Sequence, residues 1–363
     1  MKICISAPLF YNVGVAETAF HYSQINNKEF DLVFSGYIEK RVAERVKVIG
    51  KPDPLSFDDD NSNARWYPIT NENSRGIDLF VFYFDHGNFF ESEQGEKELE
   101  RIISITPREK RVVVDADGKY NQTYEYEGDK NHQSEESRKR WFSTFELLSD
   151  RIFQPSLKIS NQKVRFLPFW GYKEPIKTRQ KKYDVLYLGS NWFRMERVIK
   201  FMDNFTNLRS NFPNIAVLGK NWLMPDSYWP EATKQNREFF NNREIELIEY
   251  MTDFGEFTEL LSGSRFSQIL IRPVLGKMGL ITPRMFETFA SGTIPILTND
   301  FDYASKIYGD VVQELMLGED PIKKLEDMSK REEYYNKIAK EIREKLRKEH
   351  SFERRLEELS NLV

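Results

Sequence analysis

The sequence predicts an α/β protein with two parallel sheets, each covered by helices on both faces. Short apolar and β-branched runs alternate with longer charged segments in both halves of the chain, which indicates repeated strand, helix, strand units. A glycine-containing loop follows the first strand of each half, at Gly14 and at Gly189. The 363 residues exceed what one hydrophobic core usually holds. We therefore expect two Rossmann-like domains.

Charge and cysteine content narrow the classes of function. Lys and Arg total 53 against 57 Asp and Glu, a formal net charge of -4, which argues against a strongly cationic nucleic-acid or membrane binder but permits a local basic patch. The single cysteine, Cys4, lies in an apolar run and permits no internal disulfide, which fits a reducing compartment. No signal-peptide pattern and no apolar run of 18 residues occurs, so we expect a cytoplasmic protein.

The first domain is expected to span residues 1–170. Its predicted strands are 2–7, 31–35, 79–84 and 111–114, and a helix is predicted over 17–24. Gly14 would let the backbone approach a ligand at the end of the first strand. A single glycine differs from the G-x-G-x-x-G fingerprint, so a dehydrogenase is disfavoured.

Ionisable residues follow two of these strands. Asp85 and His86 come after 79–84, while Asp115 and Asp117 come after 111–114. Residues just beyond the carboxyl ends of parallel strands face the ligand crevice, so these four are our candidates for acid, base or substrate contacts. The alternative is that the aspartates are turn formers and helix caps.

The second domain is expected over residues 171–340, after a proline-rich linker at 167–175. Its strands at 183–188 and 215–218 end in Gly189 and Gly219, and each is followed by a cation, Arg194 or Lys220. Together with Arg284, these cations would stabilise a diphosphate leaving group without an obligatory metal, and we expect no metal site. Each cation taken alone is more commonly a solvated surface charge.

The stretch 279–299 has the strongest pattern of a functional site. Thr282 is placed to cap a helix that starts at Pro283 and ends before Gly292. Arg284 in the first turn opposes the helix dipole unless an anion compensates it, and Glu287 one turn later can accept hydrogen bonds from ribose hydroxyls. The alternative is an ordinary α/β crossover with a surface ion pair.

The segment from Thr282 to Asn299 resembles the donor-binding segment of GT-B glycosyltransferases, especially the group with CgeB-like proteins. The resemblance implies a GT-B fold, in which two Rossmann-like domains face each other across a cleft and a final helix, here 341–363, braces the first domain. It implies a nucleotide-diphosphate sugar as co-substrate, with a UDP-sugar expected. Glu287 would contact the ribose, and the loop with Gly279, Leu280, Thr282 and Arg284 would hold the diphosphate and sugar.

The activity implied is transfer of a hexose or pentose to a hydroxyl acceptor, with retention of configuration expected. One departure leaves the stereochemical outcome open: many retaining members have a glutamate eight residues before the ribose-binding one, and here that position is Gly279. Two other classes stay open on the same architecture, a nucleotide-sugar hydrolase or epimerase and a non-catalytic binding module.

Two acceptors are considered. A glycan or small molecule suits the acidic chain. Hydroxymethylated duplex DNA is the alternative, because the segments 1–5, 111–114 and 292–295 resemble phage DNA glucosyltransferases, which would place the protein in the host cytoplasm. A DNA enzyme needs a basic and partly aromatic track, for which the candidates are 65–67, 138–141 and 177–182. Sugar, nucleobase and oligomeric state are not readable from the sequence.

Overall fold

The computed structural model describes residues 1–10, 13–25, 28–53, 64–84, 93–118, 120, 135–159, 161–175, 177–191, 194–222, 234–249, 256–271 and 273–363. Two predicted acid or base candidates, Asp85 and His86, lie outside these residues. The chain divides into two compact units. Unit 1 comprises Met1–Gly171, Lys277–Ile281 and Phe352–Val363, and unit 2 comprises Tyr172–Gly276 and Thr282–Ser351.

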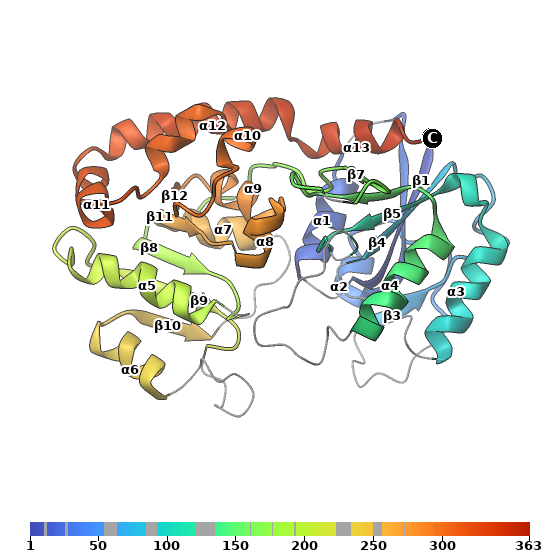
Figure 1. Ribbon diagram of the computed structural model, residues 1–363, viewed down its shortest axis with the longest axis horizontal. Helices are drawn as coiled ribbons and strands as arrows, with labels where there is room; N and C mark the ends of the chain where they lie inside the picture. Colours follow the sequence, from blue (N-terminus) through green and yellow to red (C-terminus); the bar gives the residue numbers. More distant parts are fainter. Residues whose placement is uncertain are drawn as a thin grey trace. The chain divides into compact units, whose positions relative to one another are not determined.

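Unit 1 is built on a seven-stranded sheet in the order β3-β2-β1-β4-β5-β6-β7 (Figure 1). Neighbouring strands are parallel except for the antiparallel pair β2 and β3. The strands are β1 (Lys2–Phe10), β2 (Asp31–Glu39), β3 (Ala64–Tyr67), β4 (Leu79–Phe84), β5 (Arg111–Asp115), β6 (Ile152–Gln154) and β7 (Val164–Phe166). The helices described in this unit are α1 (Val13–Ser23), α2 (Lys40–Ala43), α3 (Glu93–Ile105), η2 (Arg108–Lys110), α4 (Glu135–Leu148) and α13 (Phe352–Ser360).

Unit 2 is built on a five-stranded, wholly parallel sheet in the order β10-β9-β8-β11-β12. Its strands are β8 (Tyr183–Leu188), β9 (Ile215–Gly219), β10 (Glu246–Glu249), β11 (Ser264–Ile269) and β12 (Ile294–Leu297). The helices are α5 (Met195–Thr206), α6 (Lys234–Asn242), α7 (Phe257–Ser262), α9 (Pro283–Ala290), α10 (Ala304–Tyr308), η3 (Asp310–Leu315), α11 (Pro321–Lys330) and α12 (Glu332–Glu349), while α8 (Pro273–Met278) crosses the unit boundary.

Each sheet reverses its strand order once. In unit 1 the chain moves outward from β1 to β3 and then returns to add β4 on the other side of β1, and in unit 2 it does the same with β8, β10 and β11. In such sheets the ligand crevice lies at the reversal, beyond the carboxyl ends of the strands. The topology therefore points to the ends of β1 and β4 in unit 1 and of β8 and β11 in unit 2.

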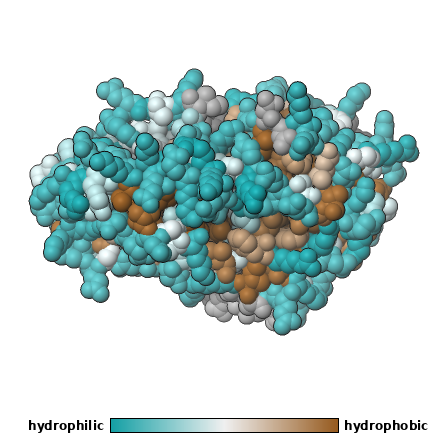
Figure 2. All heavy atoms as spheres, turned by 90° about the horizontal axis from the view of Figure 1, so that it is seen from above, coloured by the Kyte–Doolittle hydropathy of each residue, from teal (hydrophilic) through white to brown (hydrophobic). Residues whose placement is uncertain are grey.

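The sheets form because their central strands are apolar throughout. All six residues of β4 are buried, as expected for a parallel strand covered on both faces. Cys4 in β1 is also fully buried, and burial raises the pKa of its thiol to about 12. The face drawn in Figure 2 is mainly hydrophilic, with smaller apolar areas. None of the helices within the described ranges combines the length and apolar character needed to span a bilayer.

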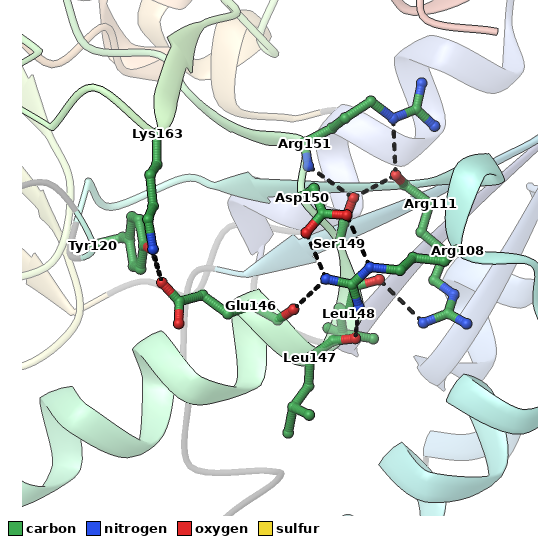
Figure 3. A network of polar contacts seen from close by, with 10 residues as sticks. All are labelled: Arg108, Arg111, Tyr120, Glu146, Leu147, Leu148, Ser149, Asp150, Arg151 and Lys163. Atoms are coloured by element: carbon green, nitrogen blue, oxygen red, sulfur yellow. Dashed lines mark hydrogen bonds and ion pairs between the residues drawn. The ribbon is translucent and has the colours of Figure 1, made fainter.

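A polar network fixes the amino-terminal end of β5 (Figure 3). The buried guanidinium of Arg111 donates to the carbonyl oxygens of Thr106 (2.9 Å), Ile103 (2.8 Å) and Leu148 (3.1 Å). The hydroxyl of Ser149 donates back to the Arg111 carbonyl at 2.6 Å. These bonds tie β5 to the ends of α3 and α4, so they set the position of the whole strand.

The expected third segment, 341–363, is divided between the two units. Helix α12 ends at Glu349, and His350 is its C-cap residue. Along its length, α12 packs against α9, η3 and β12 in unit 2. Only α13 and the residues after it belong to unit 1, where the Phe352 ring lies 5.1 Å from Tyr22 and 5.0 Å from His21. The segment therefore contains the end of one helix and a second helix, and only the second lies in unit 1.

The predicted linker at 167–175 contains the unit boundary but is packed. Leu167, Phe169, Trp170 and Tyr172 are all buried. Gly171 lies so close to α13 that a Cβ atom there would stand 2.8 Å from the Phe352 nitrogen. The close approach of two backbones explains why glycine occupies this position.

Gly171→Ala should lower the free energy of unfolding by about 1–3 kcal/mol, because the methyl group would push α13 away. Gly276→Ala is the matched control, since a Cβ atom at Gly276 would meet no atom closer than 3.9 Å. Alanine is more favourable than glycine in a helix by about 1 kcal/mol, so this variant should not be destabilised. Urea denaturation measures both. Equal stability of the two variants would contradict the packing argument.

Candidate active site

The loops that follow β8 and β9 pack backbone against backbone. The Gly189 N–H donates to the Leu218 carbonyl (2.8 Å), and the Asn191 N–H donates to the Lys220 carbonyl (2.9 Å). A Cβ atom on Gly219 would stand 2.1 Å from the Gly189 oxygen, and the φ angles of the two glycines are +151° and +156°. Only glycine fits these two positions.

Two residues that the sequence analysis did not select hold these loops. Trp222 is fully buried, and its indole N–H donates to the Gly189 carbonyl at 2.8 Å. Its ring stands edge-on to Tyr187 (5.9 Å) and Phe240 (6.1 Å). The Asn191 side chain donates to the Asn221 carbonyl at 3.3 Å. In the sequence, the position of Trp222 three residues after Gly219, at the end of a predicted strand, is the feature that could have indicated this contact.

Arg284 reaches from the first turn of α9 to the end of β8. One of its Nη atoms donates to the Leu188 carbonyl, and the other lies 3.0 Å from where a Cβ on Gly189 would be. The guanidinium also lies over the Phe257 ring, 4.1 Å from its centroid. The carbonyl and the ring fix both the direction and the plane of the guanidinium.

Arg194 and Asn191 carry buried polar atoms that no other described residue satisfies. The Arg194 Nη1 donates weakly to the Ser190 carbonyl (3.4 Å), but its buried Nε has no hydrogen-bond partner among the described residues. The same holds for the Asn191 Oδ1. Leaving such atoms unsatisfied costs about 1–3 kcal/mol each, which favours a ligand that pairs with them. Lys220, in the adjoining loop, is exposed.

The start of α9 differs from the prediction in one respect. Thr282 occupies the N-cap position with an extended backbone, but its side chain accepts no capping hydrogen bond. The Met285 N–H instead donates to the Thr282 carbonyl (3.1 Å), so the first turn is closed by the backbone. Pro283 begins the helix as predicted, and Glu287 lies half-buried one turn after Arg284.

Gly279 and Leu280 belong to a different unit from Arg284 and Glu287. The Gly279 carbonyl accepts the Leu157 N–H at 3.0 Å, and Leu280 is fully buried in an antiparallel bridge to Ser156. Gly279 has φ +62°, and a Cβ there would stand 3.3 Å from that of Leu157. The expectation of one continuous loop from Gly279 to Arg284 is therefore corrected: the chain changes units after Ile281 because residues 278–281 bond to 155–158.

In unit 1 the candidates lie near the ends of β1 and β5. Gly14 is in the first turn of α1. Asp115 is fully buried, and its carboxylate accepts the Tyr120 N–H (2.7 Å) and the Gln154 amide (2.6 Å), so it holds the loop after β5. Asp117 is half-buried in that loop, which leaves it the better placed of the two aspartates for contact with a substrate.

The predicted basic tracks are only partly at the surface. Trp66 and Trp141 are buried, so neither offers an exposed ring. In the run 177–182, Arg179 pairs with Glu259 and Lys181 donates to the Ser264 carbonyl. Within the part of the chain that the structure describes, no group of three or more His, Cys, Asp and Glu side chains is arranged to hold a metal ion.

Comparison with known proteins finds similarity of structure alone. No protein-family model and no curated protein sequence matches the chain. An α-glucosyltransferase in complex with UDP-glucose and DNA containing an abasic site matches with a TM-score of 0.65 and 14% identity, covering 100% of this chain and 98% of that one. An α-glucosyltransferase with UDP and a 13-mer DNA containing an HMU base has a TM-score of 0.62 and 12% identity, covering 100% and 99%.

The T4 phage BGT in complex with its UDP-glucose substrate also matches, with a TM-score of 0.57 and 14% identity over 99% of this chain and 98% of that one. These glucosyltransferases cover the whole chain, so the GT-B fold predicted from the sequence, with two Rossmann-like domains, is confirmed. The narrower resemblance to the CgeB-like group is not confirmed.

Trp222→Phe should lower the free energy of unfolding by about 1–3 kcal/mol, because the Gly189 carbonyl loses a buried donor. Trp170→Phe is the matched control: Trp170 is also buried, but its indole N–H has no hydrogen-bond partner among the described residues. Urea denaturation should show the larger loss for Trp222→Phe. A larger loss of stability in Trp170→Phe would contradict the conclusion that the Trp222 indole N–H holds the loop after β8.

Proposed function

We propose that the protein transfers a sugar from a nucleotide-diphosphate sugar, with UDP-glucose as the donor, to a hydroxyl acceptor. One observation carries the proposal: Arg194 and Lys220 follow β8 and β9, whose loops bond to one another at the strand-order reversal of unit 2, and Arg284 donates from the first turn of α9 to the Leu188 carbonyl at the end of β8. Two buried polar atoms there, Arg194 Nε and Asn191 Oδ1, have no hydrogen-bond partner among the described residues. The UDP and UDP-glucose complexes of the structural neighbours support the same choice of donor.

The chemistry assigned to this site is electrostatic. The bond between the sugar C1 and the diphosphate oxygen breaks, a bond from the acceptor oxygen to C1 forms, and the acceptor hydroxyl gives its proton to a base. Negative charge grows on the diphosphate, where Arg194, Lys220 and Arg284 would stabilise it. Arg284 is already oriented by Leu188 and Phe257, so little reorganisation is needed. Glu287 would accept hydrogen bonds from the ribose hydroxyls.

The acceptor that we propose is a hydroxymethylated base in duplex DNA. The neighbouring α-glucosyltransferases were captured with DNA, in one case containing an HMU base. We assign the acceptor to unit 1, with Asp117 as the candidate base and Gly14 as the point of close backbone approach.

A glycan or small-molecule acceptor is the second candidate. It is favoured by the burial of Trp66 and Trp141, which removes two aromatic rings from the predicted tracks, and by the ion pair of Arg179 with Glu259, which partly neutralises the exposed run 177–182. The net charge of -4 points the same way.

Two substitutions should separate donor binding from turnover. Glu287→Ala should weaken UDP binding by about 1–3 kcal/mol through the lost charged acceptor, whereas Arg284→Ala should lower kcat with UDP-glucose by about 10²-fold, by analogy with removal of an oxyanion donor. Calorimetry measures the first and release of UDP the second, with the exposed Lys337→Ala as control. If the unsubstituted protein does not bind UDP at millimolar concentration, the assignment of a donor site in unit 2 is contradicted.

If duplex DNA is the acceptor, its affinity should fall with salt by about 0.9 decades per decade of salt for each phosphate neutralised. Gel shifts between low and physiological salt, with plain and hydroxymethylated duplexes, measure this dependence. Transfer of labelled glucose to the hydroxymethylated duplex alone would identify the acceptor, and the anomeric configuration of the product follows by NMR. A chain that binds neither duplex at the lowest salt acts on a glycan or small molecule instead.

A further inference from the structure

Unit 2 contains a cavity on the face of its sheet that α5 covers, separate from the candidate donor site with Arg194, Lys220 and Arg284. Its volume is about 670 Å³, within the range of small-molecule sites. It is bounded by one side of α5, by the carboxyl ends of β11 and β12, and by the residues that lead into α11. Arg194, Lys220, Arg284 and Glu287 do not line it.

The base of this cavity holds a buried amide that no other side chain or backbone group in the described ranges satisfies. Gln268 is 1% exposed, and both its Oε1 and its Nε2 lack a hydrogen-bond partner among the described residues. Alternate residues of a strand share a face, and Phe266, two positions earlier in β11, packs edge-on against Phe212, which in turn contacts Phe205 of α5. Gln268 therefore points toward α5 and into the cavity that it lines.

The amide makes the cavity specific for a certain kind of polar edge. Burying a donor and an acceptor without partners costs about 1–3 kcal/mol each. A primary amide presents one N–H donor beside one carbonyl acceptor, which matches an acceptor beside a donor on a flat ring, as in the pairing of glutamine with adenine. Phe201, Leu270 and Leu317 supply buried apolar surface for the faces of such a ring.

The charges around the cavity favour a neutral ligand. Arg197 is already paired with Asp300 and also donates to the Ile271 carbonyl. The lining holds two cations, Arg197 and Lys200, against three carboxylates, Glu196, Asp300 and Glu319, so a phosphate gains no net attraction there. Reciprocal hydrogen bonds of 2.6 and 2.9 Å between the Asn299 side chain and the Gly318 backbone fix another part of the wall.

We propose that this cavity is a second small-molecule site, which binds a neutral planar heterocycle with adjacent hydrogen-bond donor and acceptor, namely a nucleobase or its nucleoside, through Gln268. The site is independent of the donor site, because it lies on residues that the transfer reaction does not use. Its ligand lacks phosphate, whereas the donor site is built around cations.

The test uses the full-length protein with adenine, adenosine, cytidine and guanosine as probes, none of which is part of UDP, and calorimetry measures their binding. At least one probe should bind saturably, and Gln268→Met should lower its affinity about tenfold or more while leaving UDP affinity unchanged. Ser267→Ala is the matched control: Ser267 is the buried neighbour on the opposite face, where its hydroxyl donates to the Leu186 carbonyl. Affinity for the probe should survive in this variant.

A second arm separates this site from the donor site. Probe binding should persist in Glu287→Ala and in the presence of saturating UDP. A crystal structure of the unsubstituted protein with the bound probe should place the ring of the probe against Gln268. Absence of saturable binding of every probe at millimolar concentration overturns the proposal and leaves a water-filled cavity. Binding that UDP displaces, or that is unchanged in Gln268→Met, also overturns it.

Discussion

The candidate donor site depends on one close approach of two backbones, between the Gly189 carbonyl and Gly219. A Cβ atom at Gly219 would stand 2.1 Å from that oxygen, far inside contact distance. The same carbonyl accepts the Trp222 indole N–H, so a change in one loop is transmitted to the other. Arg284 is placed against this unit, 3.0 Å from the position of a Gly189 Cβ. The orientation of the arginine therefore follows from the absence of two side chains.

Unit 1 uses a similar device on its own sheet. Gly36 of β2 has φ +128°, and a Cβ there would stand 1.8 Å from the Ala7 carbonyl of β1, next to an irregularity in the register of the two strands. In both units a glycine on the second strand thus lets the backbone come close to the end of the first. Because the first strand borders the strand-order reversal in each sheet, the close approach shapes the edge where a ligand is expected.

The sequence predicts the bounds of an element well where the element is buried on both faces and therefore apolar throughout. The strands at 79–84 and 183–188 have the bounds that the sequence predicts, because unbroken apolar runs define them. Helix α8 was missed because six residues carry too little periodicity. The assignment of Leu280 to unit 1 was missed because it depends on a bridge to Ser156, 124 positions away along the chain, which no local pattern reveals.

The sequence predicts which charged residues lie near the candidate site, but not which of them have their hydrogen-bond donors satisfied by the protein. The sequence indicates that Arg194 and Lys220 follow strand ends and that Arg284 lies in the first turn of a helix, but only the structure separates arginines whose donors all have protein acceptors from the others. Arg111 and Arg265 donate through Nε and both Nη atoms to protein acceptors, which marks them as structural. Arg194 keeps a buried Nε without a partner among the described residues.

An unsatisfied donor is not sufficient evidence for a ligand site by itself. The Nη1 of Arg209 is also without a partner in the described part of the chain, but Arg209 follows α5, away from the carboxyl ends of the strands, and its Nη2 donates to the Glu244 carbonyl. Arg194 differs because the unsatisfied Oδ1 of Asn191 lies in the same loop and the loop follows β8 at the strand-order reversal. An anion with hydroxyl groups, such as a nucleoside diphosphate, offers both an acceptor for the arginine and a donor for the asparagine, whereas an anion without a hydroxyl group, such as sulfate, offers only the first.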